Sequence, residues 1–197
     1  YKRQLQAGEP VPDGQALVRR LAARADVLIH NLRTDSAVSL GLDRASVAAD
    51  SRALVICRIT GFGDSRQPQS RPGYDLVVQA ESGLMAVTGP AEGEPYKVGV
   101  AVVDVLTGLE AAAGILAALV ARGGTGEGSD IEVPLLDSAA AGLVNVAQNA
   151  LATGEAPGRY GNAHPSIVPY EPFETADGHV VVAVTNDPQW QSLCRVL

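Results

Sequence analysis

The stretch from Val98 to Val120, VGVAVVDVLTGLEAAAGILAALV, constrains the fold most. It contains no proline and is rich in alanine and leucine, which are strong helix formers, so it predicts a long helix packed in the interior. Asp104 stands near its start, and aspartate is a preferred N-cap, so we expect the helix to begin at or just after this residue. A carboxylate among apolar neighbours is costly unless it is hydrogen-bonded or has a chemical role. Asp104 is therefore either a helix cap or a functional group.

The chain before this helix alternates between helical and strand patterns. A short apolar run suits a buried parallel strand, and such runs separated by amphipathic segments are typical of an α/β layer. We therefore predict an α/β fold with a Rossmann-like parallel sheet and helices on both faces. The expected helices cover residues 13–24, 34–42, 43–49 and 74–85, and the expected strands residues 25–30 and 54–59.

The chain after the central helix predicts a domain boundary. We expect a strand at 130–133, a helix at 135–152, a strand at 179–184 after a turn at 177–178, and a last helix opening at 186–188. Residues 153–172 are rich in glycine and proline, which is typical of a linker. We predict residues 1–155 as part of a large α/β domain, residues 156–172 as a linker and residues 173–197 as the start of a smaller domain.

Charge and composition exclude several classes of partner. The net charge of −7 comes without a basic stripe, which argues against nucleic acid. The longest apolar run carries Asp104 and Glu110, so we expect no membrane span. Cys57 and Cys194 match no metal-binding spacing and no signal peptide is visible, which favours a cytoplasmic protein without a bound metal. The chain begins with Tyr1, so we expect it to be part of a longer protein.

Three loops carry weak signals for a ligand. Residues 123–128 are glycine-rich but follow a helix and lack the Lys-Ser/Thr of a phosphate loop, so they predict a helix C-cap and turn. Residues 61–63 follow a strand and form either a tight turn or a ligand-facing loop, because ligands of α/β sheets bind at the carboxyl ends of strands. Asn31 and Arg33 also follow a strand, and there they either donate to an anionic ligand or form an exposed turn.

Several segments, taken together and in order, carry a resemblance to a known family. They are ARADVLIHNLR ending at Arg33, ITGFG at 59–63, RPGYDLVVQAESGLMAVTG at 71–89, KVGVAVVDVLTGLEAAAGILAAL at 97–119, TGEGSDIEVPLLDSA at 125–139 and GNAHPSIVPYEPFETADG at 161–178. The chain resembles the class III CoA-transferase family, of the CaiB/BaiF type that includes formyl-CoA transferases. The match is collinear over nearly the whole chain.

The resemblance implies a site and a reaction. It assigns Asp104 as the nucleophile and places coenzyme A contacts at Asn31, Leu32, Arg33, Arg71, Gly73, Tyr74 and Asp75. It implies transfer of CoA from an acyl-CoA to a small carboxylic acid through an aspartyl-CoA intermediate, by an interlocked homodimer. The family often has Glu or Gln, an aromatic residue and a basic residue at three positions where this chain has His30, Leu32 and Ser39.

Two other functions stay open on sequence grounds. The α-methylacyl-CoA racemases are related to this family and carry a His-Asp pair where this chain has Tyr74-Asp75. A racemase needs that histidine as a proton-transfer group, and tyrosine is too weak a base near neutral pH, so Tyr74 favours a transferase. The second alternative is a non-catalytic part of a longer enzyme. A third, a generic nucleotide-binding α/β module, is disfavoured because the dinucleotide fingerprint is absent.

Overall fold

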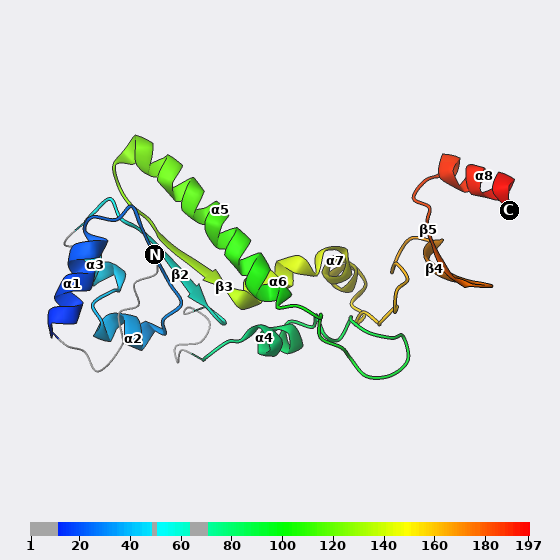
Figure 1. Cartoon of the computed structure of the whole chain (residues 1–197), viewed down its shortest axis with the longest axis horizontal. Coiled ribbons are helices and arrows are strands. Elements are labelled where there is room, and N and C mark those ends of the chain that lie inside the picture. Colours follow the sequence, from blue (N-terminus) through cyan, green and yellow to red (C-terminus); the bar gives the residue numbers. More distant parts are fainter. Residues whose placement is uncertain (1–11, 49–50, 64–70) are drawn as a thin grey trace. The chain divides into compact units, whose positions relative to one another are not determined.

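The computed structural model describes residues 12–48, 51–63 and 71–197 (Figure 1). Compact contacts divide the chain into two units. The first comprises Tyr1–Val78 and Val100–Gly142, and the second comprises Gln79–Gly99 and Leu143–Leu197. The division of the chain into residues 1–155, 156–172 and 173–197 stays a prediction. Each unit is described by itself below.

A parallel sheet of three strands forms the centre of the first unit. The strands β1 (Val27–His30), β2 (Val55–Thr60) and β3 (Asp130–Pro134) lie in the order β1-β2-β3. All three were expected, β1 and β2 from their short apolar runs, with bounds that differ by one or two residues. Because the strands are parallel, their carboxyl ends meet at one edge of the sheet.

Helices cover both faces of this sheet, as the sequence predicts. On one face, Ala22 of α1 (Pro12–Ala22) and Val47 of α3 (Arg44–Ala48) pack with Leu54 and Ile56. On the other face, Ala111 of α5 (Val102–Thr125) packs with residues of β2 and β3, namely Cys57, Ile59, Ile131 and Val133. The remaining helices of this part of the chain are α2 (Thr34–Ser39), α4 (Asp75–Glu81) and α6 (Leu135–Gly142).

The helix α5 begins earlier than the sequence predicts. It starts at Val102 with Ala101 as the N-cap, so Asp104 lies inside the first turn and is not the capping residue. The expectation that Asp104 caps the helix is therefore wrong. At the other end Gly126 adopts the left-handed conformation (φ 73°) and donates its N–H to the Arg122 carbonyl, which confirms the C-cap predicted for the glycine-rich residues 123–128.

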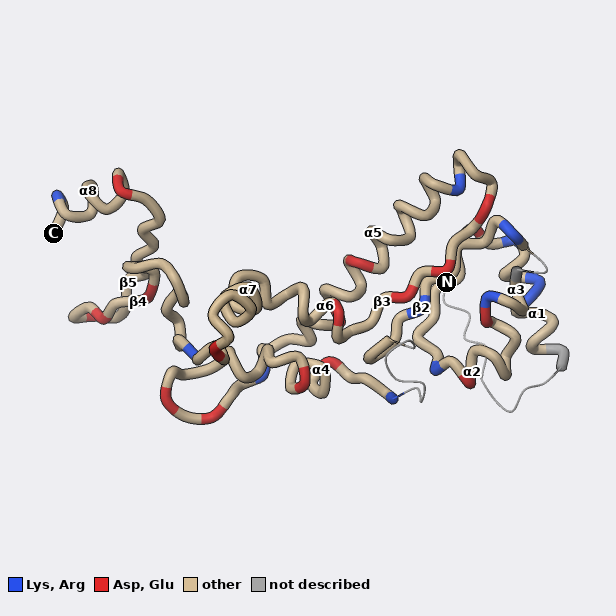
Figure 2. Tube along the Cα trace, turned by 180° about the vertical axis from the view of Figure 1, so that it is seen from behind, with Lys and Arg blue, Asp and Glu red and all other residues tan. Residues whose placement is uncertain are grey.

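The length and composition of α5 correct another expectation. Its 24 residues are long and apolar enough to cross a bilayer by these two criteria alone, whereas the sequence was expected to contain no such segment. Figure 2 shows how few charges the helix carries, and they are Asp104, Glu110 and Arg122. A mostly buried core helix passes the same test, but only about a fifth of the apolar window of α5 is buried, so the helix is less buried than the sequence predicts. Its inner face contacts β2, β3 and α6. The absence of a membrane partner stays a prediction.

Two helices differ from their predicted bounds. The expected helix at 135–152 is divided at Leu143 into α6 and α7 (Val144–Thr153), because Val144, the first residue of α7, has a φ of 43° that the interior of an α-helix does not allow. The expected helix at 74–85 ends at Glu81, and Gly83 takes a φ of 89° shortly after it. Both breaks depend on single backbone angles that hydrophobic periodicity does not report.

The second unit contains an antiparallel pair, β4 (Tyr170–Thr175) and β5 (Gly178–Ala183), and the helix α8 (Asp187–Val196). β5 and α8 were predicted, but β4 was missed because residues 170–172 were taken as linker. The Asn186 side chain accepts the Gln189 N–H at 3.0 Å and caps α8. The Arg159 guanidinium donates to the carbonyls of Ala86, Pro90 and Gly93, which fixes the loop that follows Gly83.

Candidate active site

A cavity of about 420 Å³ lies at the carboxyl edge of the parallel sheet, within the first unit. Its volume is in the roughly 300–1,000 Å³ range of small-molecule sites. The loops after β1 and β2, the segment that leads into α4 and the first turn of α5 form its walls. All eight residues assigned from the sequence line this one cavity: Asn31, Leu32, Arg33, Arg71, Gly73, Tyr74, Asp75 and Asp104. The structure thus brings the candidates together, while the role of each stays a prediction.

The sequence left the loop at 61–63 open between a turn and a ligand-facing segment, and the structure places it in the cavity wall. Gly61 lies directly against Gly73, since a Cβ added to Gly73 would stand 2.5 Å from the Gly61 Cα. Only two glycines allow this approach of backbones. Phe62 is buried, and the Arg71 guanidinium lies over its ring at 4.5 Å. These contacts couple the loop after β2 to the segment that carries Tyr74 and Asp75.

The backbone at the start of α5 is held by the side chain of Asp75. Its Oδ1 accepts the N–H of Val103 at 2.8 Å and the N–H of Asp104 at 3.3 Å. Sequence reasoning placed Asp75 near coenzyme A and missed this contact, because nothing in the local sequence pairs residues so far apart. Burial, and next the negative charge of Asp75, raise the pKa of the Asp104 carboxyl above its ordinary value.

The charges around the cavity are mixed. Among the described lining residues, Arg33 and Arg71 are positive and Asp75 and Asp104 are negative. Arginines at the cavity wall suit the phosphates or carboxylates of an anionic ligand, because guanidinium groups bind both through paired hydrogen bonds. Asp104 presents a carboxylate to the same space and is a candidate for nucleophilic attack.

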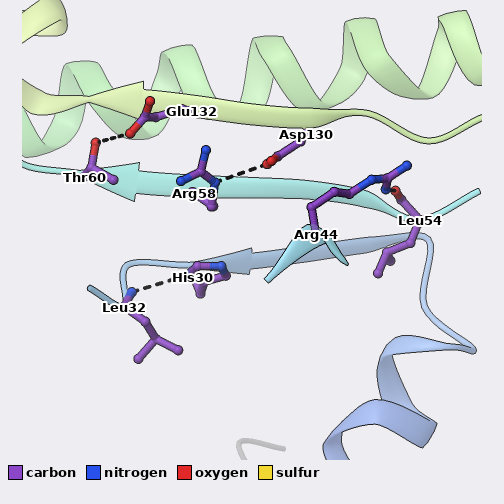
Figure 3. Close-up of polar contacts among 8 residues, drawn as sticks. All are labelled: His30, Leu32, Arg44, Leu54, Arg58, Thr60, Asp130 and Glu132. Atoms are coloured by element: carbon purple, nitrogen blue, oxygen red, sulfur yellow. Dashed lines mark hydrogen bonds and ion pairs between the residues drawn. The ribbon is translucent and has the colours of Figure 1, made fainter. Parts of the chain in front are cut away.

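His30, one of the residues at which this chain departs from the family pattern, supports the turn after β1. Its Nδ1 accepts the Leu32 N–H at 3.3 Å, and Figure 3 shows its ring on the sheet beside Arg58. The pairing of strands sets His30, Arg58 and Glu132 in one row across the sheet. Burial, and next the Arg58 charge, lower the pKa of His30, which favours the neutral ring that can accept this bond.

Ser39, the other polar departure, does not line the cavity. Its hydroxyl donates to the Ser36 carbonyl within α2 at 2.9 Å. In the part of the chain that the structure describes, no three His, Cys, Asp or Glu side chains gather as a metal site.

Comparison with known proteins gives a consistent result. The family model described as CoA-transferase family III matches residues 10–197. The succinate–glutarate CoA-transferase of Agrobacterium fabrum is 45% identical over 196 residues, covering 100% of this chain and 49% of that protein. The human succinyl-CoA:glutarate CoA-transferase is 39% identical, covering 94% of this chain and 42% of that protein.

A solved structure has the same fold. The crystal structure of a CaiB/BaiF family protein from Brucella suis is 41% identical and superimposes with a TM-score of 0.82, covering 94% of this chain and 49% of that one. The chain therefore spans about half the length of the relatives it matches.

Among the described residues, two carboxyls have shifted pKa values and provide a test of this geometry. Asp43 precedes α3 and accepts both the hydroxyl and the N–H of Ser46, the hydroxyl at 2.5 Å, and this lowers its pKa. We expect carbon-13 NMR titration to give Asp104 a pKa above the ordinary aspartate value and Asp43 one below it. The reverse order would contradict the described site.

The sign for stability follows from the same shifts. The pKa of Asp104 is higher in the folded state than in the unfolded chain. Ionisation of Asp104 therefore lowers the free energy of unfolding as the pH rises from its pKa in the unfolded chain to its pKa in the folded state. Asp43 has the opposite effect: its contribution is present above the unfolded pKa and is lost as the pH falls through the lowered folded pKa.

Proposed function

The chain belongs to CoA-transferase family III, and we propose that it provides the nucleophile and the coenzyme A site of an enzyme that moves CoA from an acyl-CoA to a carboxylic acid. The observation that carries the proposal is the single cavity in which Asp104 meets the predicted CoA-contacting residues. The relatives named above are called succinate–glutarate and succinyl-CoA:glutarate transferases. We therefore propose small dicarboxylic acids as the substrate class.

The proposed reaction proceeds through a covalent carboxylate. An Asp104 oxygen attacks the thioester carbonyl, the carbon–sulfur bond breaks, and a mixed anhydride and the CoA thiolate result. The thiolate then attacks the Asp104 carboxyl carbon and expels the donor acid, leaving an aspartyl-CoA thioester. The acceptor carboxylate attacks this thioester and releases the thiolate, which attacks the acceptor's carbonyl to give the new acyl-CoA and free Asp104. Every bond broken is matched by one formed, so the exchange consumes no water.

The position of Asp104 supports this chemistry. It lies in the first turn of α5, where the helix dipole favours negative charge. Negative charge develops on the attacked carbonyl oxygen in each step, so a site at a helix N-terminus suits the reaction. Arg33 and Arg71 are the proposed partners of the CoA phosphates, and Asn31, Leu32, Gly73 and Tyr74 the proposed walls of the CoA site.

Acyl-CoA racemase activity is the alternative within the same superfamily. Tyr74 occupies the position where a racemase needs histidine, and it lines the cavity with Asp104. Exchange of the α-hydrogen for deuterium from solvent, without transfer of CoA, would favour the racemase over the transferase.

Replacement of Asp104 tests the reaction directly. We expect Asp104→Asn in the full-length protein to reduce CoA exchange between succinyl-CoA and glutarate by at least about a thousandfold, because the nucleophile is lost. Coenzyme A should still bind in calorimetry. Mass spectrometry of the unmodified protein should find CoA attached at Asp104, and retained turnover by the variant would contradict the mechanism.

The contact between Gly61 and Gly73 provides a second test. The methyl group introduced by Gly73→Ala forces the two backbones apart. Overpacking costs about 1–3 kcal/mol, and if the complex with coenzyme A bears this cost, coenzyme A binds roughly tenfold more weakly. Gly108→Ala is the matched control, because a Cβ there meets open space in α5. Equal dissociation constants for the two variants would show that the glycine pair does not shape the site.

We also propose a cytoplasmic homodimer. The 153–172 segment is the part that we expect to cross to a partner, on the basis of the family resemblance. Light scattering on the full-length protein should give twice the mass of one chain, and the mass of one chain would contradict the proposal.

A further inference from the structure

The first turn of α5 has no side-chain cap of its own. The first N–H groups of any helix lack partners within the helix and need acceptors from elsewhere. The N-cap residue is Ala101, whose methyl group accepts nothing. The Val102 N–H donates to the nearby Val100 carbonyl, whereas the N–H groups of Val103 and Asp104 are bonded by an acceptor from another part of the chain.

That acceptor is the carboxylate of Asp75, at the start of α4. One oxygen, Oδ1, accepts the Val103 N–H at 2.8 Å and the Asp104 N–H at 3.3 Å. Asp75 is half-buried, and both bonds go to backbone groups in the first turn of α5. The side chain therefore performs for α5 the role of an N-cap, from a position 29 residues before Asp104.

The contact fixes more than a helix end. The Asp104 N–H is one of the two bonded groups, so the backbone of the proposed nucleophile is tied to α4. Tyr74 and Gly73 immediately precede Asp75 and line the cavity. The single carboxylate thereby sets the distance between Asp104 and the wall against which we expect the CoA thioester to lie.

The charge of Asp75 has a separate effect. It stands beside the Asp104 carboxylate with the same sign, and it contributes to the raised pKa of Asp104. A more basic carboxylate is a better nucleophile, provided that it remains ionised at the working pH. The other titratable or charged residues that line the cavities beside Asp104 are Arg33, Arg71, Tyr74 and His30.

We propose that Asp75 is a positioning residue for Asp104: it caps α5 from outside the helix and holds the nucleophile against the CoA-binding wall. The inference rests on the proposed function. It differs from the role that the family resemblance implies for Asp75, which is contact with coenzyme A. An oxygen that already accepts two backbone N–H groups is poorly suited to that contact, and a carboxylate repels the phosphates of CoA.

Two substitutions separate the cap from the charge. Asp75→Ala removes both, whereas Asp75→Asn keeps an oxygen that can accept the two N–H groups and removes only the charge. The matched control is Asp43→Asn, because Asp43 also caps a helix, at Ser46, but lies outside the cavity. All variants are made in the full-length protein and assayed for CoA exchange between succinyl-CoA and glutarate.

We expect Asp75→Ala to reduce kcat by roughly a hundredfold, the loss typical of a misplaced catalytic group, with the KM for succinyl-CoA within about threefold. Asp75→Asn should recover most of kcat. Its acid limb in the plot of kcat against pH should move to lower pH, because removing a neighbouring negative charge lowers the pKa of Asp104. Asp43→Asn should leave both kcat and the acid limb unchanged.

The outcomes distinguish the two proposals. An unchanged kcat and acid limb in Asp75→Asn and Asp75→Ala, with Asp104→Asn inactive, would overturn the positioning role and leave the transferase function standing. A raised KM with unchanged kcat would make Asp75 a CoA contact instead. If Asp75→Ala does not fold, the pH profile of Asp75→Asn tests the proposal: an acid limb at lower pH supports it and an unchanged acid limb overturns it. Turnover by Asp104→Asn would overturn the proposed function itself.

Discussion

The close packing of α5 on the parallel sheet is the constraint on which the site depends. Ala111 is buried against β2 and β3, and a Cβ added to Gly114 would lie 3.4 Å from the Ile131 side chain, so small residues let the helix approach the strands. The far end is held by Arg122, which donates to the Asp26 carboxylate at 2.8 Å and to the Ala53 carbonyl at 3.1 Å. Asp26 and Ala53 precede β1 and β2, so the last turn of α5 lies at the amino edge of the sheet. The first turn of α5, at the other end of the helix, therefore lies at the carboxyl edge.

The proximity of the Asp75 and Asp104 carboxylates is electrostatically unfavourable. Asp75 and Asp104 bring two negative charges to one helix terminus, where N–H groups and the helix dipole offset part of their repulsion. The raised pKa of Asp104 means that its ionised form is less favourable in the folded state than in the unfolded chain. A carboxylate that only caps a helix has a lowered pKa, as Asp43 has at α3.

The sequence predicted the α/β layer and the residues of the candidate site. The strands β1 and β2 are short apolar runs, and such runs are typical of strands in a parallel sheet. The break between α6 and α7 and the early start of α5 were not predicted. They depend on the φ of Val144 and on an acceptor from α4, and neither leaves a periodic mark in the chain. β4 was missed because Pro172 lies within it and prolines are typical of linkers.

The sequence by itself determined the family, the central helix and the choice of Asp104, because apolar runs and collinear motifs are properties of the chain alone. Only the tertiary structure decided that Asp104 is not a cap and that Asp75 is. It also decided that Gly61 and Gly73 touch, and that eight predicted residues share one cavity. These facts are contacts between distant segments. They arise from parallel strands ending at one edge and a helix beginning there, which no local pattern of residues encodes.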